Sequence, residues 1–239
     1  NVNEAPSAVA LSASSFAENA AGATIGTLSA TDPDSGETFT YALSGTDKDS
    51  FELSGTTLKL KDTVSADYES DASYSITITA TDSASNTVSK DFTVSVTNVN
   101  EAPSALALSA SSFAENAAGA TIGTLSATDP DSGETFTYAL SGTDKESFEL
   151  SGTTLKLKDS VSANYETKSS YAVTITATDS GSNSKAQDFT ISVTDVNETP
   201  SAVALSASSF AENAAGATIG TLSATDPDTG ETFTYALSG

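Results

Sequence analysis

Residues 74–80 read Tyr-Ser-Ile-Thr-Ile-Thr-Ala, and residues 171–177 read Tyr-Ala-Val-Thr-Ile-Thr-Ala. Apolar side chains alternate with Ser and Thr, which is typical of an antiparallel strand with one face in a core and the other in water. Similar short apolar segments occupy residues 9–16, 25–30, 39–43, 51–53, 58–60 and 92–96. Turn sequences such as Asp32-Pro-Asp-Ser-Gly36 separate them, and no helix-length apolar period appears. The pattern predicts seven short strands within about 97 residues, as in a β-sandwich.

The same pattern returns because the chain is a repeat. Asn3-Glu-Ala-Pro6 recurs at residues 100–103 and, as Asn-Glu-Thr-Pro, at 197–200, and positions 4–100 differ from 101–197 at 16 of 97 places. A period of 97 residues is too long for a solenoid unit and suits a self-contained domain of immunoglobulin size. The sequence therefore predicts an all-β chain of tandem immunoglobulin-like, seven-stranded Greek-key sandwiches in a linear array.

The period also predicts the domain divisions. Residues 1–6 form a partial upstream linker, 7–99 repeat 1, 100–196 repeat 2, and 197–239 the N-terminal part of a third repeat. This last segment lacks the sequence for the later strands, so we expect that it cannot close a sandwich as its siblings do.

Composition excludes several classes of function. The chain has 32 acidic residues against 9 lysines, a net charge of −23, and neither Cys nor His. Nucleic acids and anionic membrane surfaces would repel so acidic a protein, and no apolar run is long enough to cross a membrane. Without His or Cys for nucleophilic chemistry, and without a phosphate-binding Gly loop, the sequence predicts a protein that is not an enzyme.

Oxygen-bearing side chains gather in clusters that recur with the repeat. In repeat 1 they are Glu18, Asp32 with Asp34, Asp67 with Glu69, Asp82, and the linker residues Asn98, Asn100 and Glu101. A donor set of oxygens alone disfavours zinc and copper and suits Ca²⁺. Because turns lie at the ends of strands, we expect these clusters at the two poles of each sandwich. Glu37, by contrast, is expected on a solvated surface.

In five of its motifs the chain resembles the cadherin repeats. The motifs are Glu18-Asn19, Asp32-Pro-Asp-Ser-Gly36, Asp67-Tyr-Glu69, Ala80-Thr-Asp82 and the linker Val99-Asn-Glu-Ala-Pro103. Near-identical repeats, Thr and Ser richness and the absence of Cys are most similar to the extender repeats of giant bacterial surface adhesins. The resemblance implies cadherin-like sandwiches with Ca²⁺ at each linker between repeats.

The resemblance also implies the ligands. At the first joint they are Glu18, Asp67, Glu69, Asn98, Asn100, Glu101, Asp129, Asp131 and Asp179. At the second they are Glu115, Glu166, Asp195, Asn197, Glu198, Asp226 and Asp228, and at the start of repeat 1 they are Asn3, Glu4, Asp32, Asp34 and Asp82. Asn164 stands where repeat 1 has Asp67, so we expect the second joint to lose a carboxylate at this position.

Two functions follow as hypotheses. The first is a Ca²⁺-rigidified extracellular spacer at the cell surface, whose partners are neighbouring repeats of the same chain, while a cell-surface or glycan target is bound by domains outside this sequence. The second is a homophilic or glycan-recognising module in which the repeats themselves make the contact. Neither an exposed Trp nor an aromatic platform for sugar is present to favour the second.

Overall fold

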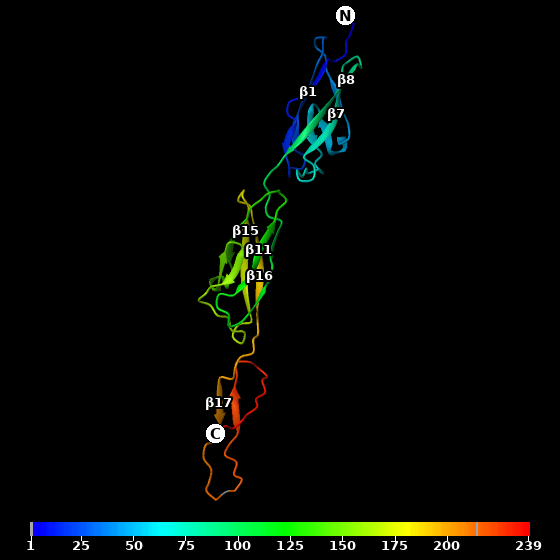
Figure 1. The fold of residues 1–239 in the computed structure, drawn as a ribbon. Coiled ribbons are helices and arrows are strands. Elements are labelled where there is room, and N and C mark those ends of the chain that lie inside the picture. Colours follow the sequence, from blue (N-terminus) through cyan, green and yellow to red (C-terminus); the bar gives the residue numbers. More distant parts are fainter. Residues whose placement is uncertain (1, 214) are drawn as a thin grey trace. The chain divides into compact units, whose positions relative to one another are not determined.

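The computed structural model describes residues 2–213 and 215–239, which divide between residues 101 and 102 into two compact units. Figure 1 shows the first unit in blue to cyan, with strands β1 (Ala8–Leu11), β7 (Ser73–Thr81) and β8 (Thr87–Thr97). No helix of the described residues is long and apolar enough to span a membrane.

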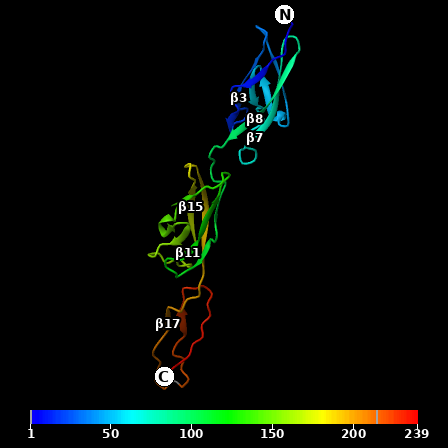
Figure 2. The ribbon, with the colours of Figure 1, turned by 45° about the horizontal axis from the view of Figure 1, so that its top comes forward.

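Unit 1 is a sandwich of two four-stranded sheets, which confirms the predicted fold class. One sheet has the order β1, β3 (Thr24–Thr31), β6 (Thr57–Leu60) and β5 (Phe51–Ser54). The other has the order β2 (Ser15–Ala17), β8, β7 and β4 (Thr40–Ser44), and the 3₁₀ turn η1 (Lys48–Ser50) precedes β5. Strands β7 and β8 pair antiparallel along their length and lie side by side in Figures 1 and 2.

The core lies between the sheets and follows the alternation seen in the sequence. Ile76, Ile78 and Ala80 of β7 are fully buried, and the threonines between them face outward. Leu58 and Leu60 of β6 meet them from the other sheet. The alternating stretch quoted first therefore forms the centre of the fold.

The structure has eight strands in the repeat instead of seven, because the segment predicted as one strand at residues 9–16 divides between the two sheets. Its first part, β1, pairs antiparallel with β3, and its second part, β2, pairs parallel with β8. The division occurs where Gly26 passes so close to Ala13 that a Cβ on the glycine would lie 2.9 Å from the Ala13 backbone. The Ser12 hydroxyl accepts the Thr27 backbone N–H at 2.8 Å, which fixes this crossing. Small Ser and Ala side chains allow the strand to change sheets here.

Unit 2 contains a second sandwich of the same design. One sheet has the order β9 (Ala105–Leu108), β11 (Thr121–Thr128), β14 (Thr154–Leu157) and β13 (Phe148–Ser151). The other has the order β10 (Ser112–Ala114), β16 (Ser184–Thr194), β15 (Ser170–Thr178) and β12 (Thr137–Ser141), and the 3₁₀ turn η2 (Lys145–Ser147) precedes β13. The remaining strands, β17 (Ala202–Leu205) and β18 (Leu222–Thr225), form a two-stranded sheet. Val203 is 67% exposed there, whereas its equivalent Val9 is 1% exposed, since no second sheet covers it among the described residues.

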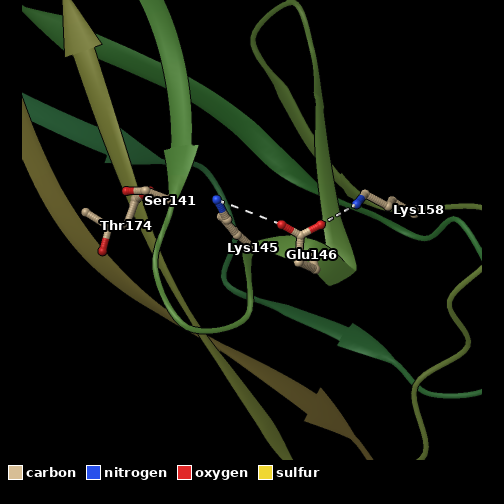
Figure 3. Close-up of polar contacts among 5 residues, drawn as sticks. All are labelled: Ser141, Lys145, Glu146, Lys158 and Thr174. Atoms are coloured by element: carbon tan, nitrogen blue, oxygen red, sulfur yellow. Dashed lines mark hydrogen bonds and ion pairs between the residues drawn. The ribbon is translucent and has the colours of Figure 1, made fainter.

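Acidic residues on the sides of the second sandwich lie beside lysines. Glu146 lies between Lys145 and Lys158, at 3.8 and 3.5 Å, while the Ser141 hydroxyl donates to the Thr174 carbonyl at 3.3 Å (Figure 3). The Glu146 side chain remains 80% exposed, so these pairs contribute little to stability.

The ion pair around Lys168 depends on a residue that differs between the two sandwiches. In repeat 2, Lys168 pairs with Asp144 and its ammonium lies 4.7 Å from the centre of the Tyr171 ring. Repeat 1 has Asp71 at the position of Lys168, so it lacks this cation. Desolvation is the largest cause that raises the pKa of Tyr74 in repeat 1, and the negative charges of Asp71 and Asp47 raise it further.

We therefore expect Asp71→Lys to stabilise repeat 1 by about 0.5–1 kcal/mol, because it adds a partly exposed ion pair and a cation–π contact. Hydrogen exchange of the core amides of each repeat measures this change separately in the two sandwiches. Lys168→Asp should weaken repeat 2 by a similar amount, and unchanged exchange in both variants would contradict the assignment.

Candidate metal sites at the poles of the sandwiches

The C-terminal pole of repeat 1 is organised around the buried carboxylate of Glu18, which is 3% exposed. Glu18 directly follows β2, and its two oxygens accept the backbone N–H groups of Tyr68 at 2.6 Å and Val99 at 2.8 Å. Tyr68 belongs to the β6–β7 loop and Val99 to the linker after β8. One carboxylate thus joins three chain segments that are far apart in the sequence.

Further acids surround Glu18 at this pole. Oxygens of Glu18, Asp67 and Glu69 lie within 4.8 Å of one another. The Asn98 amide donates to Glu69 at 3.3 Å, and the amide of Asn19 donates to Glu101 at 2.6 Å. The sequence-predicted residues of this pole are therefore brought together.

Repeat 2 builds the same pole with different members. Glu115, 3% exposed, accepts the N–H groups of Tyr165 and Val196, both at 2.8 Å. Its oxygens lie within 4.8 Å of those of Glu166 and Asp195. Asn164 instead accepts the Thr167 backbone N–H at 2.8 Å, within its own turn.

Acids of the third segment join this cluster. Oxygens of Glu166, Glu198 and Asp228 lie within 4.8 Å of one another, and Asp228 accepts the Glu198 N–H at 2.7 Å. Asp226 accepts the N–H of Asp228 at 3.1 Å, and the amide of Asn197 donates to the carbonyl of Glu198 at 2.9 Å. The residues predicted for the second joint therefore lie close together.

Like charges at this site perturb the carboxylates. Desolvation, followed by the charges of Asp228, Glu115 and Glu198, raises the pKa of Asp195. A backbone hydrogen bond lowers the pKa of Glu166, but burial and the charges of Glu115, Glu198 and Asp195 outweigh it and the net shift is upward. The cluster therefore carries more negative charge than its protein surroundings compensate.

The N-terminal pole of repeat 1 gathers the second set of predicted residues. The Asn86 amide donates to Asn3 at 2.7 Å and to the buried Asp82 at 3.0 Å. Asp34 accepts the Glu4 N–H at 2.8 Å, and Asp32 accepts the Asp34 N–H at 2.9 Å.

Two residues of this pole were missed by the sequence analysis. Glu37, expected on a solvated surface, is partly exposed and also accepts the Asn3 amide at 3.0 Å and the Ser83 hydroxyl at 2.7 Å, so it belongs to the hydrogen bonds of this pole. Asn86 was not singled out, although it orients both Asn3 and Asp82. Their recurrence as Glu134 and Asn183 was the available signal.

In repeat 2, the equivalent pole again places its acids close together. Asp129 accepts the Asp131 N–H at 3.1 Å, and Asp179 accepts the Asn183 N–H at 2.8 Å. Desolvation raises the pKa of Asp129; a hydrogen bond from Asp131 opposes this, and the charges of Asp131, Asp179 and Glu134 add to it. The residues predicted for the first joint belong to two units, and within each unit its own group of predicted residues lies close together.

The donor set fits a hard cation. Among the described residues, Oδ2 of Asp32 and of Asp129, Oε2 of Glu198 and Oδ1 of Asp228 are buried and meet no hydrogen-bond donor. A buried carboxylate oxygen without a partner is costly, and a bound cation removes that cost. Carboxylate and amide oxygens are ligands that Ca²⁺ accepts, six to eight at a time.

We expect Glu18→Gln to destabilise repeat 1 by about 1–3 kcal/mol even without metal, because a buried amide cannot accept both backbone N–H groups without facing one with its own N–H₂. Urea unfolding in chelator measures the effect, with Glu115→Gln as the matched change in repeat 2. Glu52→Gln, on an exposed side of the sandwich, is the control, and equal losses for Glu18→Gln and Glu52→Gln would contradict the structural role of Glu18.

Comparison with known proteins agrees with this architecture. The model of the cadherin domain matches residues 12–97 and 109–194. Human protocadherin Fat 4 is 32% identical over 228 residues, which cover 88% of this chain and 5% of that protein. The chain thus spans a small part of this relative's length.

Solved structures give the same result. The protocadherin gammaB7 EC3-6 cis-dimer structure has a TM-score of 0.60 at 26% identity, over 95% of this chain and 57% of that one. Mouse cadherin-23 EC22-24 has a TM-score of 0.64 at 25% identity, over 91% and 75%. The matched family consists of adhesion domains and not of enzymes. Because the family model matches both sandwiches, which share one topology, and together more than half of the chain, the chain belongs to the cadherin domain family.

Proposed function

We propose that the chain is part of an extracellular cell-surface adhesion protein, in which Ca²⁺ binds at the poles of the repeats and rigidifies the linkers between them. The observation that carries the proposal is the convergence of carboxylates from separate segments, with buried oxygens that no donor meets. In the second joint, Glu115, Glu166, Asp195, Glu198 and Asp228 would hold the ions. For the first joint, we propose that the ions are held by the residues that the cadherin resemblance implies as its ligands.

Calcium would supply positive charge and coordination to these oxygens, while the protein holds the oxygens in place. Glu18 and Glu115 position the loop and linker, and Asn19 and Asn116 hold the linker glutamates, the second through a 2.8 Å hydrogen bond to Glu198. When the acids of a linker bind the same calcium ions as the acids of the sandwich before it, the linker loses conformational freedom relative to that sandwich. This mechanism needs no change in the sandwich cores.

A spacer role is the more economical form of the function. The two complete repeats differ at 16 of 97 positions, and their sides carry Thr, Ser and solvated ion pairs. A spacer requires length and stiffness from each repeat, and near-identical repeats supply both. Near-identity and the absence of Cys support the finer assignment to extender repeats of a bacterial adhesin, whereas the relatives named above are animal proteins.

Homophilic adhesion is the second candidate. The related protocadherin gammaB7 EC3-6 structure is a cis-dimer, which supports contacts between cadherin repeats of neighbouring chains in that protein. Sedimentation at millimolar Ca²⁺ separates the two candidates here. A chain that stays monomeric supports the spacer, and reversible dimers in Ca²⁺ that disappear in chelator support adhesion by the repeats.

Calcium should raise the melting temperature of the chain. Ligand bound only by the folded state adds about 2.7 kcal/mol at a concentration 100 times Kd, and extracellular modules bind Ca²⁺ with Kd of about 10⁻⁴–10⁻³ M. Calorimetry in 10 mM Ca²⁺ and in chelator measures the shift, and Asp129→Ala/Asp131→Ala should reduce it. Glu146→Ala, a side acid, is the control; identical melting with and without Ca²⁺ would refute the calcium proposal.

A further inference from the structure

The two repeats differ at two of the proposed ligand positions, and the two differences are opposite in sense. Repeat 1 has Asp67 and Asn98, whereas repeat 2 has Asn164 and Asp195 at the equivalent positions. All other positions of the proposed ligand set are identical between the two complete periods. The carboxylate that is absent at position 164 is therefore present at position 195, which offsets the loss expected from the sequence.

The structure places both positions at the same cluster in repeat 1. Asp67 supplies the third carboxylate beside Glu18 and Glu69. The side chain of Asn98 reaches the same Glu69, donating its amide N–H at 3.3 Å. A carboxylate at position 98 would therefore lie against the cluster that Asp67 now completes.

Repeat 2 has the alternative arrangement. Asp195 supplies the third carboxylate beside Glu115 and Glu166. Asn164 keeps the turn that Asp67 forms in repeat 1: Asp67 accepts the Ser70 N–H at 3.1 Å, and Asn164 accepts the Thr167 N–H at 2.8 Å. The turn therefore needs an acceptor at this position but does not need its charge.

We infer that the loop position (67 or 164) and the linker position (98 or 195) are alternative locations for one carboxylate ligand, and that a group of three carboxylates, of which Glu18 or Glu115 is one, is what the site requires. This inference rests on the calcium function proposed above. Its consequence is a difference between the joints. In repeat 1 the movable carboxylate belongs to a loop of the sandwich, whereas in repeat 2 it belongs to the linker, so Ca²⁺ attaches the second linker through one more charged ligand.

Exchange of the two residues in the full chain tests the inference. The variants are Asp67→Asn, Asn98→Asp and the double change, which gives repeat 1 the pattern of repeat 2. The backbone amides of Val99 and Val196, which donate to Glu18 and Glu115, are matched NMR reporters of the two sites during Ca²⁺ titration. Asp71→Asn removes a nearby charge outside the cluster and is the control.

Asp67→Asn should raise the Ca²⁺ midpoint at Val99 by about tenfold, since ligand charge count tunes affinity. The double change should restore the midpoint to within about threefold of the parent chain, with Val196 unaffected throughout. Asn164→Asp/Asp195→Asn should likewise leave the Val196 midpoint near its original value. A double variant no tighter than Asp67→Asn alone overturns the inference while leaving the calcium function intact, and a parent chain whose two reporters ignore Ca²⁺ overturns both.

Discussion

The buried carboxylate of Glu18, with Glu115 as its counterpart, is the contact on which the arrangement of each C-terminal pole depends. It closes the sandwich by accepting N–H groups from the β6–β7 loop and from the linker. Because both oxygens are used in this way, the loop and the linker must pass next to a fixed negative charge. In repeat 1 the other acids of the pole, Asp67, Glu69 and Glu101, lie on one of those two segments, so the closure of the fold and the concentration of negative charge have the same cause.

A negative cluster of this kind is stable only if something offsets the repulsion. Backbone N–H groups and Asn amides do part of this, as the Asn98 and Asn19 contacts show. The raised pKa of Asp195, caused by desolvation and then by its acidic neighbours, shows that compensation in repeat 2 is incomplete. On the sides of the sandwich, lysines stand beside the acids, as around Glu146. The poles therefore differ from the sides in chemistry as well as in position.

The sequence predicted the fold well wherever alternation determines burial. The stretch at residues 74–80 is central because its Ile and Ala side chains point one way and its Thr side chains the other. The division of the first strand was not predicted, because Ser12 and Ala13 carry no apolar signal and the close approach of Gly26 depends on a neighbouring strand. The seven-strand expectation thus failed where the close packing of two backbone segments decides the path of the chain.

The sequence predicted that the acids lie at the two ends of each sandwich, but it did not predict their individual hydrogen-bond partners. Glu37 looks like an ordinary surface acid in sequence, and its contact with Asn3 joins residues 34 positions apart. Such a contact can be recognised only when the three-dimensional arrangement of the pole is known. The same limitation affects Asn164, whose lost charge appears as a defect when each motif is read alone. Asp195 lies in the same cluster as Glu115, so the charge of the site depends on how many carboxylates lie together with Glu115. The sequence motifs show only to which chain segment each of those carboxylates is attached.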